Sequence, residues 1–402
     1  MALRPGDPSE PISALDHHDA PFAYTFGQET GSASQSWFRG HIARFNPTAA
    51  QMRDADAVPQ HILAGFLPPT PVIGPDTRVL AFGSCFAIHV TRWLANRSYT
   101  VLNTDDARKD AYIVRFGEGL VNSFVLRQQF EWALEGARFP TALWYDDAGT
   151  AHPYSDDIRQ QTRAMILDTD VFILTLGLSE IWYDIPSGGV FWRAVPEPVF
   201  DPQRHGFRTS TVAENRDNIL AIQALIRKHR PDARVIFTLS PIPLVATFRP
   251  MPTIPANAVS KATLRAALDE AMNAARDPRL HYWPAYEIVM DAFDNRWLPD
   301  RRHVKREVLD YVLTLFETFW CHGSTPRITP VEALVHARAA TGALPPTLSR
   351  AIKNGNTGRL ERLLASLSDA DDVSLILAAA RDAGHRMTNS AGDALRTWLK
   401  TR

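Results

Sequence analysis

Residues 77–85 read Thr77-Arg78-Val79-Leu80-Ala81-Phe82-Gly83-Ser84-Cys85. A short apolar run that is stopped by a glycine is typical of a buried strand. The residues that follow place Phe86, Val90, Trp93 and Leu94 at the spacing of one helix face. The stretch therefore predicts a strand, a tight turn and an amphipathic helix in direct succession.

The same alternation of strands and helices continues along the chain. We predict further strands at 99–103, 171–176 and 234–239, a short strand before Trp283, and helices near 121–134 and 212–228. Strands separated by helices imply a parallel sheet with crossover connections, so the predicted fold class is α/β. Residues 240–260 contain five prolines. They are expected to form a long ordered loop at a strand's carboxyl end, the edge where open α/β sheets bind ligands.

The 402-residue chain divides by composition into three segments. Residues 1–75 hold 10 of the 29 prolines and show no sustained helical period, which predicts an irregular N-terminal extension. Residues 76–326 carry the α/β pattern and are expected to form the main domain. Residues 327–402 are expected to form a small C-terminal helical appendage, with helical patterns at 330–340, 347–353, 357–367 and 371–383.

Charge and cysteine content narrow the class of protein. The chain has 43 basic and 44 acidic side chains, a net charge of −1, so no sequence-wide field attracts nucleic acid or anionic lipid. Two cysteines, Cys85 and Cys321, are too few for a disulfide framework and indicate a reducing compartment. No secretory signal is visible, and no apolar run approaches the roughly 20 residues that span a bilayer. We predict a cytoplasmic protein with no nucleic-acid partner and no membrane span, and leave its oligomeric state open.

Cys85 stands where the predicted strand turns into the predicted helix. Such a turn displays a side chain above the sheet, and the free N–H groups and dipole of the helix start stabilise an anion there. A thiol in that place is more nucleophilic than usual. The alternative is that Cys85 is a small buried apolar residue, as most free cysteines are.

A second reactive pattern is Asp300-Arg301-Arg302-His303, which precedes an amphipathic helix containing Val308, Leu309 and Phe316. An aspartate three residues before a histidine can orient one imidazole nitrogen and leave the other free as a general base. The alternative is that Asp300 only caps the helix and His303 is an exposed surface residue.

Together these segments resemble a known family. The run Phe82-Gly83-Ser84-Cys85-Phe86-Ala87 carries the signature from which the GSCFA family takes its name. The resemblance spans about 76–320 and continues in Thr175–Trp182, Ser240–Pro243, Asn257, Ser260-Lys261, Tyr282–Glu287 and Asp300-x-x-His303. The family looks like a branch of the SGNH/GDSL hydrolase superfamily. That resemblance implies a flavodoxin-like three-layer α/β/α sandwich around a central parallel sheet.

The resemblance also implies roles for single residues. It places Cys85, rather than Ser84, at the nucleophile position, and Asp300 with His303 on the superfamily's Asp-x-x-His pair. The superfamily's oxyanion-binding Asn is replaced here by Ser179, so the hole is expected to use the N–H of Cys85 and a glycine, either Gly117 or Gly119. The residues assigned to oxyanion or substrate binding are Ser84, Gly117, Gly177, Ser179 and Glu180.

Some of these residues have a second interpretation. Glu180 could orient the substrate or His303, or it could be a strand-end carboxylate bonded to backbone. Trp182, Tyr183, Phe191 and Trp192 could stack on a sugar, although such clusters are more often part of a core. No set of metal ligands with structural spacing is present, so no metal is expected.

The expected activity is that of an acyl-ester hydrolase or acyltransferase with a covalent acyl-enzyme intermediate. Cysteine in place of serine favours transfer over hydrolysis, because a thioester stays reactive toward an acceptor. The resemblance points to a small-molecule or glycan acyl substrate, as in polysaccharide biosynthesis, with no cofactor and with acyl-CoA as a candidate co-substrate. The alternative is a catalytically silent module that binds a glycan or CoA. In a third hypothesis, residues 1–75 and 327–402 dock partner subunits or close over the site.

Overall fold

The structure is a computed structural model that describes residues 46–146, 148–192, 194–323 and 327–401, with the backbone of 22–26 and 29–33. It divides into two compact units, Met1–Asp54 and Ala55–Arg402. In the first unit, β1 (Phe22–Phe26) and β2 (Glu29–Ala33) form an antiparallel pair. The prediction of an irregular extension over 1–75 did not anticipate this pair. Residues 1–21, 27–28 and 34–45 lie outside the described part of the chain.

A parallel sheet of four strands organises the second unit. It contains β3 (Val79–Gly83), β6 (Val171–Leu176), β9 (Arg234–Leu239) and β10 (Leu280–Trp283) in the order β10-β9-β6-β3. These strands fall where the apolar runs predicted them, so the α/β class is confirmed. Because each strand returns to the sheet in the same direction, their carboxyl ends meet at one edge.

The predicted strand at 99–103 is wrong. Val101 makes a single parallel bridge to Val79, and the chain then enters a 3-10 turn over Leu102–Thr104. The side chain of Asn103 explains the interruption: its Oδ1 accepts the N–H of Ala81 at 3.0 Å and its Nδ2 donates to the Ala81 carbonyl at 2.9 Å. A side-chain amide thus takes the bonds that a fifth strand would make.

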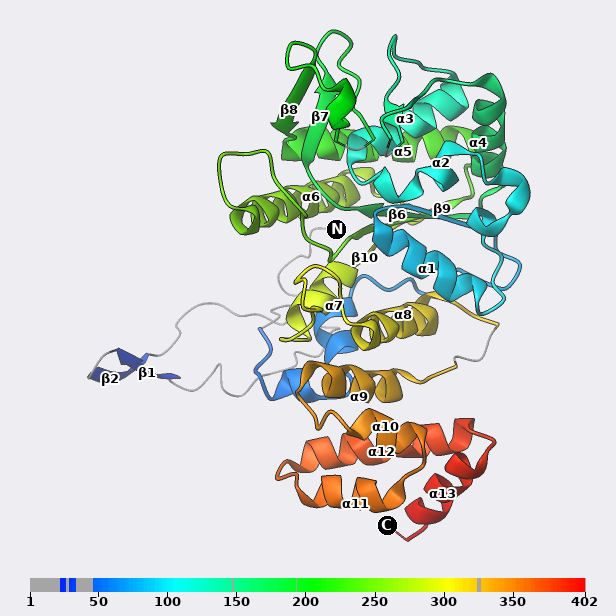
Figure 1. Ribbon diagram of the computed structural model, residues 1–402. Helices are drawn as coiled ribbons and strands as arrows, with labels where there is room; N and C mark the ends of the chain where they lie inside the picture. Colours follow the sequence, from blue (N-terminus) through cyan, green and yellow to red (C-terminus); the bar gives the residue numbers. More distant parts are fainter. Residues whose placement is uncertain are drawn as a thin grey trace. The chain divides into compact units, whose positions relative to one another are not determined.

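Successive residues of each strand pack into opposite layers, as the pleat of a strand requires. Val79, Ala81 and Ile173 belong to a core with α1 (Cys85–Ala95), α7 (Ala285–Asp291) and α8 (Arg306–Trp320). Leu80, Phe82 and Leu174 face a second core with α3 (Ser123–Phe130), α5 (Val212–His229) and α6 (Thr253–Ala275). Helices therefore cover both faces of the sheet, which makes a three-layer sandwich (Figure 1).

The connections contain smaller elements. They are α2 (Tyr112–Arg115), β4 (Trp144–Tyr145), β5 (Ala151–His152), α4 (Asp156–Asp168), β7 (Glu180–Asp184) and β8 (His205–Thr209), with β7 and β8 paired as an antiparallel hairpin. The predicted loop at 240–260 is too long, because α6 begins at Thr253. Pro252 caps that helix and Pro255 lies in its first turn, where no backbone N–H is needed.

Five helices follow the sandwich: α9 (Pro330–Thr341), α10 (Leu348–Lys353), α11 (Thr357–Ala365), α12 (Ala370–Arg386) and α13 (Ser390–Leu399). Four of them match the predicted helical segments, and α13 was not predicted. Their apolar faces share one core with α8, in which Phe316, Val335 and Ile376 are each 0% exposed. The C-terminal helices therefore continue the packing of the second unit. No helix in the described part of the chain is long and apolar enough to cross a membrane.

Candidate active site

The turn between β3 and α1 is held by its contact with β6. Gly83 has φ +129°, and a Cβ built there would lie 2.2 Å from the carbonyl oxygen of Thr175, so glycine is needed at this position. The N–H of Ser84 donates to the Thr175 hydroxyl at 2.5 Å, and the two hydroxyl oxygens lie 2.9 Å apart. The turn is therefore fixed from across the sheet.

Within this turn, Ser84 and Cys85 have different surroundings. Ser84 is the N-cap of α1; its Oγ accepts the N–H of Phe86 at 3.3 Å, and the residue is 3% exposed. Cys85 is the first residue of α1 and is only partly buried. Of the two side chains, the thiol is the one that the turn presents at the surface.

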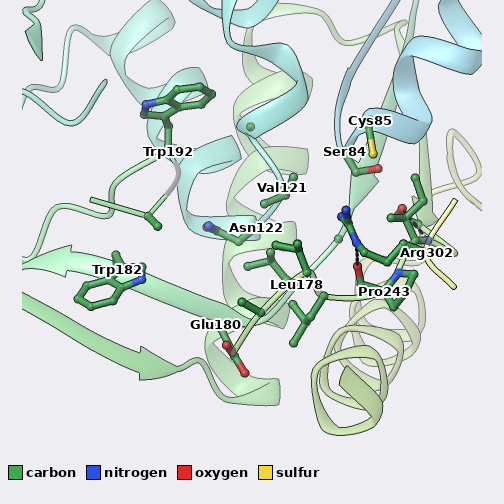
Figure 2. Close-up of a pocket in the computed structure, with 18 of the residues that line it drawn as sticks. Ser84, Cys85, Val121, Asn122, Leu178, Glu180, Trp182, Trp192, Pro243 and Arg302 are labelled. Carbon is green, nitrogen blue, oxygen red and sulfur yellow. Dashed lines mark hydrogen bonds between the residues drawn. The ribbon is translucent and has the colours of Figure 1, made fainter. Parts of the chain in front are cut away.

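Cys85 opens onto a cavity of about 610 Å³ at the carboxyl edge of the sheet. Its lining comes from distant parts of the chain and includes Ser84, Cys85, Gly177, Glu180 and His303. Figure 2 shows Ser84 and Cys85 at one end of this pocket and Trp182 and Trp192 on the opposite side. The fold thus brings all five of these residues, which the sequence assigned to catalysis or to oxyanion or substrate binding, to one cavity.

Asp300 reaches the pocket through His303. Its Oδ2 accepts the Nδ1–H of His303, while its Oδ1 accepts the backbone N–H groups of Arg302 and His303, each at 3.0 Å. The bond from the Arg302 N–H, followed by those from His303, lowers the pKa of Asp300 to about 2. Asp300 does not cap α8, since that helix begins at Arg306 after Lys305. The carboxylate instead orders its own turn and fixes one nitrogen of the imidazole.

Three other residues assigned from the sequence lie differently from expectation. Gly117 is outside this cavity and lies beside Phe82, whereas Gly119 lines it. The N–H of Gly119, however, donates to the carbonyl of Phe116 at 2.8 Å. Ser179 is fully buried and outside the lining, and its hydroxyl has no hydrogen-bond partner among the described residues. The backbone N–H of Ser179 is engaged, because it donates to the Ser260 hydroxyl at 2.7 Å.

Glu180 is a pocket residue at the start of β7. It is 7% exposed, and its Oε1 accepts the hydroxyl of Thr247 at 2.7 Å. The partner is therefore a side chain of the 240–252 loop rather than the backbone. Arg302 reaches the same loop from the other end of the pocket, where its Nε lies 3.5 Å from the Pro243 carbonyl (Figure 2). Both charged residues connect this loop to the rest of the pocket.

The far wall of the pocket is aromatic. Trp182, Phe191 and Trp192 line it, as do Phe207 and Phe248, whereas Tyr183 is outside the lining. The ring of Trp182 meets Phe248 edge to face at 4.8 Å and lies 5.3 Å from Phe207. Phe248 is 57% exposed, so this apolar wall continues to the protein surface.

Sequence reasoning gave no role to two polar residues at the site. Asn122 caps α3, with its Oδ1 accepting the N–H of Val125 at 3.0 Å, and lines the pocket. That bond sets the orientation of the amide, whose Nδ2 has no partner in the part of the chain that the structure describes. The second residue, Lys261, is buried behind the pocket and bonded to three carbonyl oxygens. Asn122 could have been predicted as a helix cap from the sequence. Nothing in the sequence around Asn122 or Lys261 indicates that either residue lies at a pocket.

No group of three His, Cys, Asp or Glu side chains among the described residues is arranged to hold a metal ion. The fold and the pocket define a three-layer α/β protein with a cysteine at its first strand-to-helix turn and an Asp–His pair at the same sheet edge. The chain belongs to the GSCFA family, which matches residues 78–316. That span contains every residue that lines the pocket. A search of curated proteins finds no match to the chain.

Proposed function

We propose that this protein transfers or hydrolyses an acyl group through a covalent intermediate on Cys85. The observation that carries the proposal is that Cys85, at the start of α1, and His303, oriented by Asp300, line the same cavity. A nucleophile, a base and a residue that orients the base are the three parts of this chemistry. The resemblance to SGNH/GDSL hydrolases supports the same assignment.

The reaction follows from these positions. Because the Nδ1–H of His303 is held by Asp300, Nε2 is the nitrogen that can accept a proton. As Sγ of Cys85 attacks the carbonyl carbon of an ester or thioester, its proton passes to Nε2. The tetrahedral intermediate then breaks its bond to the leaving oxygen or sulfur, which takes that proton and departs. An acceptor hydroxyl or water attacks the remaining thioester in the same way and restores the thiol.

Ser84 is a poorer nucleophile than Cys85 in this arrangement. Ser84 is 3% exposed, and its hydroxyl is already bonded to the Phe86 N–H and to the Thr175 hydroxyl. A thiolate at the helix start also gains from the helix dipole. The two free cysteines of the described chain, Cys85 and Cys321, support a reducing, cytoplasmic setting in which the thiol persists.

The walls of the pocket support a substrate with both apolar and polar groups. Its aromatic side offers Trp182 and Phe248, while Glu180 and Asn122 offer an acceptor and a donor. Aromatic faces combined with a few polar groups suit a glycan or another polyhydroxylated acceptor. The opening toward exposed Phe248 leaves room for a substrate larger than the 610 Å³ cavity.

The direct test is to trap the intermediate. The purified protein is incubated with acetyl-CoA or with p-nitrophenyl acetate, and the masses of the intact protein and its peptides are measured. We expect one acetyl group on Cys85, absent from Cys85→Ala and retained in Cys321→Ser, which removes the other, 7% exposed cysteine. Acetylation that persists in Cys85→Ala, or turnover without any dependence on Cys85, contradicts the proposal.

The second function, a silent binding module, is favoured by one observation. Ser179 stands where the superfamily has its oxyanion-binding Asn, and its hydroxyl is buried outside the cavity. Loss of one such donor typically costs about 3–4 kcal/mol of transition-state stabilisation. A binding module would take up a glycan or CoA equally in wild type and Cys85→Ala, as measured by calorimetry, and would form no product.

A further inference from the structure

Lys261 has an unusual position for a lysine. It lies on α6, is 2% exposed, and donates to the carbonyl oxygens of Gly177 at 2.7 Å, Ser240 at 2.7 Å and Ile242 at 2.8 Å. Lysines are almost never fully buried without compensating partners. Here all three ammonium hydrogens have an acceptor, an arrangement that only the protonated side chain completes.

The three acceptors belong to the pocket. Gly177 follows β6, Ser240 and Ile242 follow β9, and all three residues line the cavity. One ammonium group therefore joins the carboxyl ends of two neighbouring strands, directly behind the surface that a substrate would contact. None of the proposed reaction steps uses this ammonium group.

One of the three acceptors, Gly177, connects the ammonium to the reactive turn. A Cβ built on Gly177 would lie 3.6 Å from the Cβ of Ser84, and Ser84 precedes Cys85. Burial lowers the pKa of Lys261 to about 7, while a negative charge on Cys85 acts in the opposite direction. A charge on either group therefore favours the opposite charge on the other, and the burial of Lys261 limits screening by water on its side of the pair, whereas Cys85 is partly exposed.

We propose that Lys261 is a positioning residue that stabilises the Cys85 thiolate with its enclosed positive charge, in addition to joining the ends of β6 and β9. The inference rests on the proposed function of Cys85. Its consequence is that the thiolate forms at lower pH than it would beside a neutral side chain. A cysteine next to a cation is a stronger nucleophile near neutral pH.

Other charged or titratable groups share this region. On the pocket side they are Glu180 of β7 and Arg302 and His303 of the turn before α8. Asp300 faces His303, and His89 follows Cys85 by one helical turn on α1. Asp300 and His303 are about half exposed, so solvent screens them. Glu180 is a buried carboxyl group, and a negative charge on it opposes thiolate formation.

The test separates charge from hydrogen bonding. The rate of Cys85 alkylation by iodoacetamide is measured from pH 5 to pH 10 in wild type, Lys261→Met and Lys261→Gln, all in a Cys321→Ser background. Lys261→Gln keeps amide donors for the carbonyls but carries no charge. We expect the pH of half-maximal rate to rise by about 1 unit in both variants. The control Lys228→Met removes a lysine of α5 that pairs with Glu135 and is 62% exposed, and it should leave the profile unchanged.

A purely structural role predicts that Lys261→Gln keeps the wild-type profile, and that result overturns the proposal. If both variants fail to fold, reciprocal coupling still provides a test. The ¹³Cε resonance of Lys261 is titrated in wild type and in Cys85→Ser, and we expect a lower pKa for Lys261 in the variant. An identical titration contradicts the proposal. Neither the alkylation rate nor the Lys261 titration requires turnover. If the acyl-transfer proposal alone is wrong, the Lys261 variants still shift the pH profile of Cys85 alkylation, but Cys85 is not acylated by the ester or acetyl-CoA.

Discussion

The two sides of the proposed dyad are held by opposite means. The Cys85 turn is fixed across the sheet, where Ser84 bonds to Thr175, a residue 91 positions away in the sequence. The His303 turn is fixed locally, by hydrogen bonds to Asp300 only three residues away. Ser84 is 3% exposed, whereas the His303 side chain is 53% exposed. The turn that carries the partly buried nucleophile is therefore anchored in the core, whereas the base lies on a locally ordered surface turn.

This difference predicts that variants of one turn lower mainly the stability and variants of the other lower mainly the activity. Changes in the Cys85 turn disturb the contact between β3 and β6 and should lower the free energy of unfolding. Changes in the Asp300–His303 turn should impair the chemistry and leave the fold intact. The following variants test this contrast, in order of decreasing effect.

His303→Ala should lower turnover of an activated ester by about 10³-fold, the usual contribution of a general base. The half-exposed side chain makes little packing contact, so the melting temperature should stay within a few degrees of wild type. Initial rates and thermal unfolding measure the two effects. Arg301→Ala, in the same turn but outside the pocket lining, is the control for general disturbance of the turn. A large fall in stability with His303→Ala would mean that the surface turn is structural after all.

Gly83→Ala should lower the free energy of unfolding by at least about 3 kcal/mol, because it combines a disfavoured φ with a clash against backbone. The matched control is Gly188→Ala, at φ +73° with no atom within 4 Å of the added Cβ. That variant meets only the left-handed backbone penalty of about 1–2 kcal/mol. Urea unfolding of both proteins gives the comparison. Equal losses would show that the close approach of β3 and β6 does not constrain the turn.

Asp300→Asn should lower turnover by about 10–10²-fold, a smaller loss than removal of the base itself. The amide keeps the shape of the turn but removes the negative charge that holds the Nδ1–H of His303. Steady-state kinetics compare it with Asp300→Glu, which retains the charge on a longer side chain. If Asp300→Asn matched wild type, the carboxylate would only order the turn.

The smallest expected effect is the loss at low pH of the stability that Asp300 contributes. The pKa of Asp300 is about 2 in the folded protein, below its usual value of 3.8. A lowered pKa means that this group's contribution is complete above about pH 4 and is lost as the pH falls through 2. The stability difference between wild type and Asp300→Asn, measured by urea unfolding, should be constant from pH 7 to pH 4. A difference that disappears already between pH 6 and pH 5 would contradict the lowered pKa.

Local patterns predicted much of the fold, and their failures have local causes. The runs at 171–176 and 234–239 became β6 and β9 because an uninterrupted apolar stretch is buried from both faces. The stretch at 99–103 has a shorter apolar run and contains Asn103, whose side chain replaces the strand's own backbone bonds. The start of α6 was missed because prolines, which usually interrupt helices, are compatible with a first turn.

The site was predictable only in part. Cys85 and the Asp300–His303 pair carry short motifs that can be recognised without knowing the fold. Asn122 and Lys261 carry none, because their positions at the pocket depend on how α3 and α6 pack against the sheet. The same limitation applies to Gly117 and Gly119, which differ by two positions in sequence and lie in different cavities. Whether such a residue lines the pocket depends on packing between segments that are distant in the sequence.

The central claim is that Cys85 and His303 act together in one acyl transfer, and a double-mutant cycle tests it most directly. Turnover of an activated ester is measured for wild type, Cys85→Ala, His303→Ala and the double variant. Residues that act as a unit show strongly non-additive losses. We predict that the double variant is no slower than Cys85→Ala alone. Losses that multiply, or full activity in His303→Ala, would contradict the account.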